Sequence, residues 1–220
     1  PGSLRDTVAA ALDGDTIDLA HLTCSVITLT TGAVEVPVPN LILAGPGRTA
    51  LAIDGNGADR VLFHPFGGAL TLRGLALRNG HASAEGNNIT GGGCIASAGY
   101  LVLQDSIVSG CSSAAVGSYG GAVYAYSMTM ERSTLSGNWA AGIHSQASTA
   151  AFGGAAFVYS MELRQSTISD NHAWHQGNPA FSDYDIGGGI VCVRQGYLLG
   201  STVSGNRSQG RGGGLVSFSG

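Results

Sequence analysis

Hydrophobic and polar positions alternate along most of this chain in short runs. In the first third, runs of three or four residues follow one another, separated by Gly, Pro, Asn or Asp; they span 16–19, 26–29, 34–36, 41–43, 51–53, 61–63 and 70–72. Alternation between turn residues is typical of β-strands, and no helical pattern lies between the runs. The pattern predicts an all-β chain in which strand follows strand.

Residues 1–15 show a different pattern, that of a short helix. Ser3 can cap its N-terminus, Asp6 stands three residues later as in a capping box, and residues 8–12 are rich in Ala. Asp13-Gly14-Asp15 would end this helix. Because the first turn of a solenoid needs a cover, we predict an N-terminal capping helix in 1–15 and repeats over 16–220.

A longer unit recurs from residue 90 onward. The copies at 119–138, 152–171 and 186–206 each have a Gly pair, an apolar strand, a Ser-Thr-x-Ser group and an Asn. A looser copy spans 90–111 and ends in Cys111, and a partial copy spans 211–220. The Gly pairs begin 29, 33, 34 and 25 residues apart. Periods of this size indicate one unit stacked on copies of itself. The partial last copy leads us to expect a segment of a longer repeat protein.

Alignment of the copies places similar residues in rows. Two of the rows consist of Ser106, Ser133, Ser166 and Ser201, and of Asn79, Cys111, Asn138, Asn171 and Asn206. Such rows suit parallel, in-register strands, in which stacked Asn amides hydrogen-bond between neighbouring coils and Gly pairs mark a second corner. We therefore predict a parallel β-helix (solenoid), right-handed because crossovers between parallel strands are.

These repeats resemble those of two groups of proteins. The Gly-pair segments with Ser-Thr-x-Ser-x-Asn look like the repeats of polymorphic outer-membrane proteins and are similar to secreted bacterial right-handed parallel β-helix proteins with a pectate-lyase-like fold. The segments S-L-R-D, L-I-L-A-G-P-G and L-T-L-R-G-L-A-L-R-N-G resemble the usual opening of the second group. The resemblance implies a secreted or cell-surface bacterial protein. It consists of corner and core residues, so it implies a fold rather than an activity.

Composition excludes several classes of function. The hydrophobic fraction is 44 % and the charged fraction 11 %, which is the composition of a folded chain. A net charge of −4 argues against a nucleic-acid partner, and no apolar run is long enough to span a membrane. All ten basic residues are Arg, which excludes lysine-based catalysis.

The four cysteines lie far apart, without a metal-binding spacing; they are Cys24, Cys94, Cys111 and Cys192. Cys94, Cys111 and Cys192 stand at repeat positions otherwise held by Val, Asn or Ala, and we expect these three mainly as small buried residues. A disulfide is the alternative.

Segments of unequal length connect the Asn corner to the next Gly pair, at 80–90, 112–119, 139–152, 172–186 and 207–211. Because all of them leave from one corner, we expect loops that stack into a ridge, where solenoids commonly bind ligands. The candidate ligand-binding residues are Trp139, His144, His172, Trp174, His175, Asp183, Tyr184 and Asp185, with His81 and Glu85 also in these segments. The tryptophans either stack on sugar rings or pack the loops onto the coil. We predict no metal site, since His-x-x-His on a loop fixes no geometry.

The strands that follow the Gly pairs carry a second set of aromatic residues. If Val123, Ala125, Ala156, Val158, Ile190 and Cys192 point inward, an apolar ladder points outward, made of Tyr124, Tyr126, Phe157, Tyr159, Val191 and Val193. An apolar surface of this extent predicts a partner or assembly face. In the opposite phase the aromatic rings would lie in the core.

We interpret the chain as a non-enzymatic extracellular or cell-surface segment for binding, adhesion or assembly. Its expected partners are a polysaccharide, a host or cell-surface ligand, or further copies of itself. One alternative is a polysaccharide lyase or glycoside hydrolase acting in a groove lined by 139–152 and 172–186; another is a self-associating extracellular filament subunit. No cofactor is expected, and calcium alone is left open, because the acidic residues on the strands do not cluster.

Overall fold

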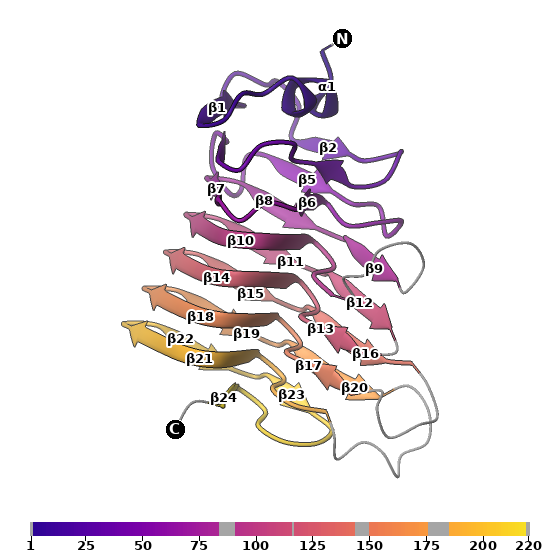
Figure 1. Cartoon of the computed structure of the whole chain (residues 1–220), viewed down its shortest axis with the longest axis vertical. Coiled ribbons are helices and arrows are strands. Elements are labelled where there is room, and N and C mark those ends of the chain that lie inside the picture. The colour runs from indigo at the N-terminus through magenta and orange to yellow at the C-terminus, as the bar shows by residue number, and fades with distance from the viewer. Residues whose placement is uncertain (1, 84–90, 116, 144–149, 176–184, 219–220) are drawn as a thin grey trace.

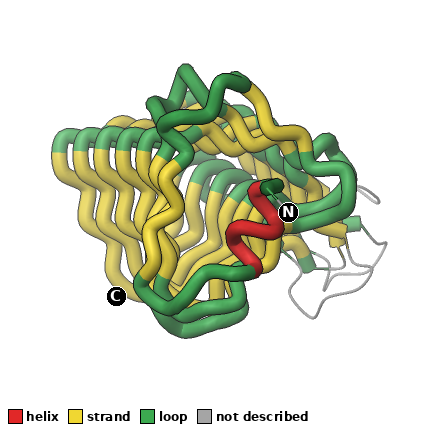
Figure 2. The backbone as a smooth tube through the Cα atoms, turned by 90° about the horizontal axis from the view of Figure 1, so that it is seen from above, coloured by secondary structure: helices red, strands yellow, loops and turns green. Residues whose placement is uncertain are grey.

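The protein is a parallel β-solenoid that begins with a helix. A computed structural model describes residues 2–83, 91–115, 117–143, 150–175 and 185–218. Every strand pair in these ranges is parallel, and the strands stack into a column with the helix at its N-terminal end (Figure 1). Seen from above, successive coils lie over one another (Figure 2). The predicted all-β class, parallel β-helix and capping helix are confirmed.

The capping helix α1 (Leu4–Ala9) forms where the capping signal predicts it. The Ser3 hydroxyl accepts a hydrogen bond from the Asp6 backbone N–H at 3.1 Å, and Leu4 and Val8 join the apolar core. The helix ends earlier than the Ala-rich run suggests. The Asp15 carboxylate accepts from the Leu12 backbone N–H at 2.8 Å, so the residues after Ala10 form a turn instead.

The strands form four parallel sheets. Sheet A contains β1 (Asp15–Asp18), β4 (Leu41–Ala44), β7 (Ala69–Arg73), β10 (Ile95–Gln104), β14 (Val123–Glu131), β18 (Ala156–Arg164), β21 (Ile190–Leu199) and β24 (Leu215–Ser217), with β3 (Val34–Glu35) and β6 (Leu62–His64) beside this path. Sheet B contains β2 (Val26–Thr28), β5 (Ala52–Asp54), β8 (Ala76–Arg78), β11 (Ile107–Ser109), β15 (Thr134–Ser136), β19 (Thr167–Ser169) and β22 (Thr202–Ser204). Sheet C contains β9 (His81–Ser83), β12 (Ser112–Ala115), β16 (Trp139–Gly142), β20 (His172–His175) and β23 (Arg207–Ser208), and sheet D pairs β13 (Ser118–Tyr119) with β17 (Ala151–Phe152).

Three corners turn each of the later coils, and each corner has a row of residues with positive φ. Between sheets A and B the row is Gly74, Asp105, Arg132, Gln165 and Gly200. Between sheets B and C it is Asn79, Gly110, Gly137, Asp170 and Gly205, and before sheet A it is Gly92, Gly120, Gly153, Gly187 and Gly212. The left-handed conformation thus recurs at the same three points of each coil.

The predicted Asn row is correct except at its first member. Arg78 pairs with Ser109, so Asn79 aligns with Gly110 and belongs to the positive-φ row. Asn138, Asn171 and Asn206 form the row of stacked amides. Each later amide oxygen accepts hydrogen bonds from the backbone N–H and the side-chain amide of the Asn one coil earlier, at 2.8–3.0 Å. The side chains of these three Asn residues therefore form the hydrogen-bonded row. The residues directly before them, Gly137, Asp170 and Gly205, have the left-handed backbone conformation.

The serine row is confirmed as a second hydrogen-bonded row. The backbone N–H of Ser106, Ser133 and Ser166 each donates to the hydroxyl of the Ser one coil later, at 3.0, 3.2 and 3.1 Å. The first three of these serines are buried. Each of these hydroxyls therefore accepts a hydrogen bond from a backbone N–H that is buried away from water.

A disulfide joins Cys94 to Cys111, which corrects the expectation that the cysteines are mainly isolated buried residues. Cys111 occupies the Asn row, and Cys94 directly precedes β10, so the closing of one coil brings their Cα atoms to 5.5 Å. Cys24 is an exposed free thiol, and only Cys192 is both free and buried. Cys94, Cys111 and Cys192 are therefore all buried, as expected of the three cysteines in the repeats, but Cys94 and Cys111 are paired.

Replacing both Cys94 and Cys111 with Ala is expected to lower the free energy of unfolding by about 3 kcal/mol, because the bond closes a chain segment of 17 residues. Urea unfolding of this variant, and of the wild type in reductant, measures the loss. Cys192→Ala is the control, which should keep its response to reductant. Equal urea midpoints for the oxidised wild type and the double variant would contradict the prediction.

Candidate functional site

The segments predicted as a ridge of loops begin as the strands of sheet C, at the right of Figure 1. Their first residues pair in register, so one outward row runs through the coils: His81, Ser112, Trp139, His172 and Arg207. The next position faces inward, where Ala82, Ser113, Ala140 and Ala173 are buried. The described starts of these segments stack as regular strands, and residues 84–90, 144–149 and 176–184 of the predicted ridge lie outside the described part of the structure.

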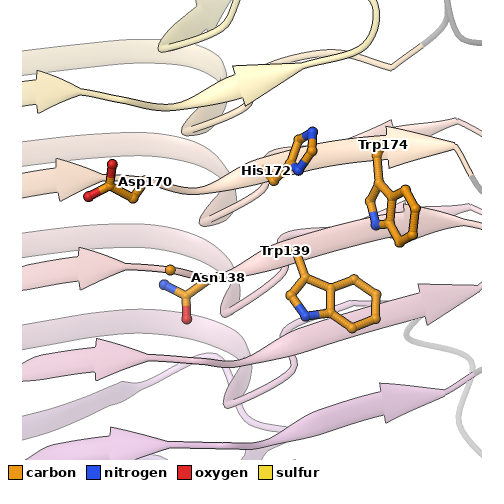
Figure 3. A pocket seen from close by; sticks show the side chains of 6 residues that line it. Asn138, Trp139, Asp170, His172 and Trp174 are labelled. Carbon is orange, nitrogen blue, oxygen red and sulfur yellow. The ribbon is translucent and has the colours of Figure 1, made fainter.

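A hollow of about 320 Å³ lies on the outer side of β16 and β20 (Figure 3). It is lined by Gly137, Asn138, Trp139, Asp170, His172 and Trp174. The ring centroids of Trp139 and Trp174 are 6.1 Å apart at an interplanar angle of 75°, and the His172 imidazole lies 6.3 Å from the Trp174 ring. Two tryptophans from neighbouring coils thus meet edge to face beside an open space.

Among the described residues, few polar groups line the hollow. The Asn138 amide is engaged in the Asn row, where it donates to the Val108 carbonyl and to Asn171. Burial, together with repulsion from Arg207, holds the pKa of His172 below its ordinary value, so its imidazole is neutral at neutral pH. Asp170 contributes the one carboxylate of the lining. The described lining of the hollow is therefore mainly apolar, with one carboxylate at its edge.

The structure brings together three of the eight predicted site residues: Trp139, His172 and Trp174. It places Asp185 elsewhere, since this side chain is fully buried and its carboxylate accepts a hydrogen bond from the Ala151 N–H at 2.9 Å. Asp185 is therefore a structural residue, which corrects its assignment to the site. His175 lies in β20, and its side chain is outside the described part of the structure, as are His144, Asp183 and Tyr184.

Three lining residues were not predicted as site residues: Gly137, Asn138 and Asp170. Asn138 was predicted at a corner and Asp170 was not among the candidates, yet both border the hollow. The sequence does carry a signal for them, because each stands one or two residues before an outward residue of sheet C. Among the described residues no cluster of His, Cys, Asp and Glu could hold a metal ion.

The second aromatic surface has the predicted phase. Val123, Ala125, Ala156, Val158, Ile190 and Cys192 are all fully buried, and Tyr124, Tyr126, Phe157 and Tyr159 face outward. Val191 is the exception: it follows the outward phase but is fully buried, so it does not belong to the exposed ladder. Tyr100, Tyr119 and Phe152 extend the surface, which we call the aromatic face.

Ring orientation distinguishes the aromatic face from the hollow. Tyr124 stacks on Phe157, Tyr126 on Tyr159, and Tyr119 on Phe152, with interplanar angles of 5°, 26° and 8°. Rings that stack from coil to coil cover each other's faces, so the aromatic face is knit together by its own contacts. A sugar ring needs an uncovered aromatic face. The Trp139 indole meets Trp174 edge to face and His81 at a tilt of 47°, so none of the described rings stacks on it, whereas the His172 imidazole stacks on Trp174 at 24°.

Comparison with known proteins adds no family. No protein-family model, no curated protein and no solved structure matches this chain. No helix among the described residues has the length and apolar character to cross a bilayer. The parallel β-helix itself is the part of the resemblance noted above that the structure supports.

Proposed function

We propose that this chain is a binding module for a neutral glycan, which sits in the hollow of sheet C and stacks on Trp139 and Trp174. The observation that carries the proposal is the edge-to-face pair of indoles beside a hollow of about 320 Å³. In an edge-to-face pair, the ring that offers its edge keeps both faces free of its partner. A flat, uncovered indole is a favourable surface for the C–H face of a sugar ring.

The polar lining favours a neutral glycan over an acidic one. His172 is uncharged at neutral pH, because burial lowers its pKa, and it can both donate and accept hydrogen bonds to hydroxyl groups. The carboxylate of Asp170 accepts hydrogen bonds from hydroxyls but repels the carboxylates of an acidic polysaccharide. A neutral polysaccharide therefore matches the charge of this surface.

We further propose that the protein acts outside the cytoplasm, secreted or on a cell surface, as its resemblance to polymorphic outer-membrane proteins and pectate-lyase-like β-helices implies. The disulfide between Cys94 and Cys111 supports this, because disulfides persist in oxidising compartments. The ligand would then be a polysaccharide met outside the cell, such as one on a host or neighbouring cell surface.

Trp139→Ala and Trp174→Ala are each expected to weaken glycan binding about tenfold, because each removes an aromatic platform worth about 1–1.5 kcal/mol. Affinity electrophoresis in gels containing neutral or acidic polysaccharides measures the effect. The control is Tyr126→Ala on the aromatic face, where 46 % of the side chain is exposed and binding should not change. Stronger retention by acidic gels, or loss of retention only in the Tyr126 variant, would contradict the proposal.

The alternatives have less support among the described residues. A glycoside hydrolase needs two carboxyl groups about 5–9.5 Å apart. The described lining of the hollow contains one carboxylate, that of Asp170, and the Asp185 carboxylate is buried and accepts a hydrogen bond from the Ala151 N–H. Self-association is the other alternative, and the aromatic face is its predicted surface. Assembly through that surface stays a prediction that sedimentation at increasing concentration can test.

A further inference from the structure

A serine and a histidine meet on the outer side of sheet C, one coil before the first tryptophan. His81 in β9 and Ser112 in β12 are partners in the parallel register, and the His81 Nδ1 lies 2.7 Å from the Ser112 Oγ. Ser112 is 7 % exposed and is in turn the register partner of Trp139. The imidazole lies 6.4 Å from the Trp139 ring, so the pair borders the platform proposed for the glycan.

The surroundings of His81 keep its imidazole neutral, so one ring nitrogen is unprotonated. Burial is the main cause that lowers the pKa of His81; Arg60 lowers it further, and the attraction of the Asp59 carboxylate opposes both. A neutral imidazole can accept the hydroxyl proton of Ser112 at Nδ1. Once protonated, it would be stabilised by the same Asp59 carboxylate. The Asp59 carboxylate accepts hydrogen bonds from the backbone N–H groups of Ala33 and Arg60, at 3.1 and 2.7 Å, and acts on His81 through its charge. A serine hydroxyl bonded to a neutral histidine is the arrangement that activates the hydroxyl as a nucleophile.

We infer that Ser112 and His81 form a nucleophile–base pair that transfers the acyl group of an O-acyl ester to water. The Ser112 Oγ attacks the ester carbonyl carbon while its proton moves to the His81 Nδ1. The C–O bond to the leaving alcohol breaks, and the alcohol takes that proton. Water, deprotonated by His81, then attacks the acyl-serine and releases the carboxylic acid and the free serine.

The position of the pair indicates the substrate class. An acyl group carried by a sugar stacked on Trp139 would lie next to Ser112, because the two residues are neighbours across one coil spacing of about 4.8 Å. The substrate is therefore an O-acylated carbohydrate. This activity goes beyond glycan binding, and the reactivity of Ser112 toward a small acylating probe does not depend on it.

The core contains a matched pair that serves as an internal control. The His64 Nε2–H donates to the Pro39 carbonyl at 3.0 Å, which leaves Nδ1 to accept from the Ser97 hydroxyl at 2.8 Å. His64 and Ser97 are both fully buried. They have the same chemistry as the Ser112 pair but no access to a ligand, so Ser97 should stay unreactive in the folded protein.

The test is covalent labelling of the full chain by a small fluorophosphonate, located by mass spectrometry. Trypsin cleaves after Arg78 and Arg132, so both serines fall in one peptide and its fragment ions distinguish them. We expect labelling at Ser112 and none at Ser97. His81→Gln, which keeps a polar side chain but no base, should slow labelling about 100-fold. Ser112→Ala should abolish both labelling and hydrolysis of p-nitrophenyl acetate.

The pH profile separates an activated serine from a structural hydrogen bond. With His81 as base, the labelling rate should rise as pH increases through its lowered pKa and be level at neutral pH. Absence of label at Ser112, equal label at Ser97, or a rate that His81→Gln leaves unchanged would overturn the inference. None of these results would bear on glycan binding, which the tryptophan variants test separately.

Discussion

Replacement of Asn171 by Ala is expected to lower the free energy of unfolding by about 5 kcal/mol. The side-chain amide of Asn171 is buried and makes hydrogen bonds in both directions along its row. Its removal takes away the acceptor of the Asn138 backbone N–H and of one Asn138 amide hydrogen, at 3.0 and 2.9 Å, and a donor to the Leu135 carbonyl, at 3.1 Å. Each buried polar group left unpaired costs about 1–3 kcal/mol.

Asn206→Ala is the matched control for this prediction. Asn206 bonds Asn171 in the same way, at 2.8 and 3.0 Å, but lies on the last described coil and is only partly buried. Water can replace its amide there, so we expect a loss of about 1–2 kcal/mol. Urea unfolding followed by circular dichroism compares the two. Equal losses would mean that burial of the row does not set the cost.

Gly154→Ala is expected to destabilise the protein by about 4 kcal/mol or more, because there is no space for a Cβ atom. A methyl group at this position would lie 2.1 Å from the Gly188 carbonyl oxygen and 2.5 Å from the backbone of His172. Both obstacles are main-chain atoms. They cannot move without breaking hydrogen bonds of the coil, so overpacking here exceeds its usual cost of about 1–3 kcal/mol.

Gly67→Ala provides the comparison, since a Cβ at Gly67 meets nothing within 4 Å and the backbone there has no positive φ. This variant should be neutral or more stable by up to about 1 kcal/mol, through the reduced freedom of the unfolded chain. Thermal and urea unfolding of both variants give the difference. A Gly154 variant as stable as the Gly67 variant would show that the coils do not approach each other as closely as described.

Much of the fold could be predicted because the same sequence pattern recurs in several repeats. In-register stacking requires the same residue type at the same point of each coil, which is why the Ser row and the three later Asn residues align as expected. The error at Asn79 has a physical reason. Asn suits both a bonded amide row and a left-handed corner, so residue type alone could not tell which row Asn79 joins.

The site was harder to predict than the coil. Trp139, His172 and Trp174 could be predicted because outward residues at the start of stacked segments must lie together. Asp185 was misplaced because its burial depends on a hydrogen bond to Ala151, a residue of another coil with no distinctive pattern. The disulfide was missed for a similar reason: Cys94 and Cys111 meet only when a coil closes. The pairing of Ser112 with His81 also depends on register across coils.

The unequal segments between Asn corner and Gly pair carry a consequence for engineering. Val123, Ala156 and Ile190 remain in register after the segments, as Ser112, Trp139 and His172 do before them, although the chain lengths between successive coils differ. The register of the strands therefore does not depend on the length of these segments. New peptide sequences grafted at these junctions should therefore be displayed side by side, with the solenoid serving as a ready-made scaffold for multivalent recognition.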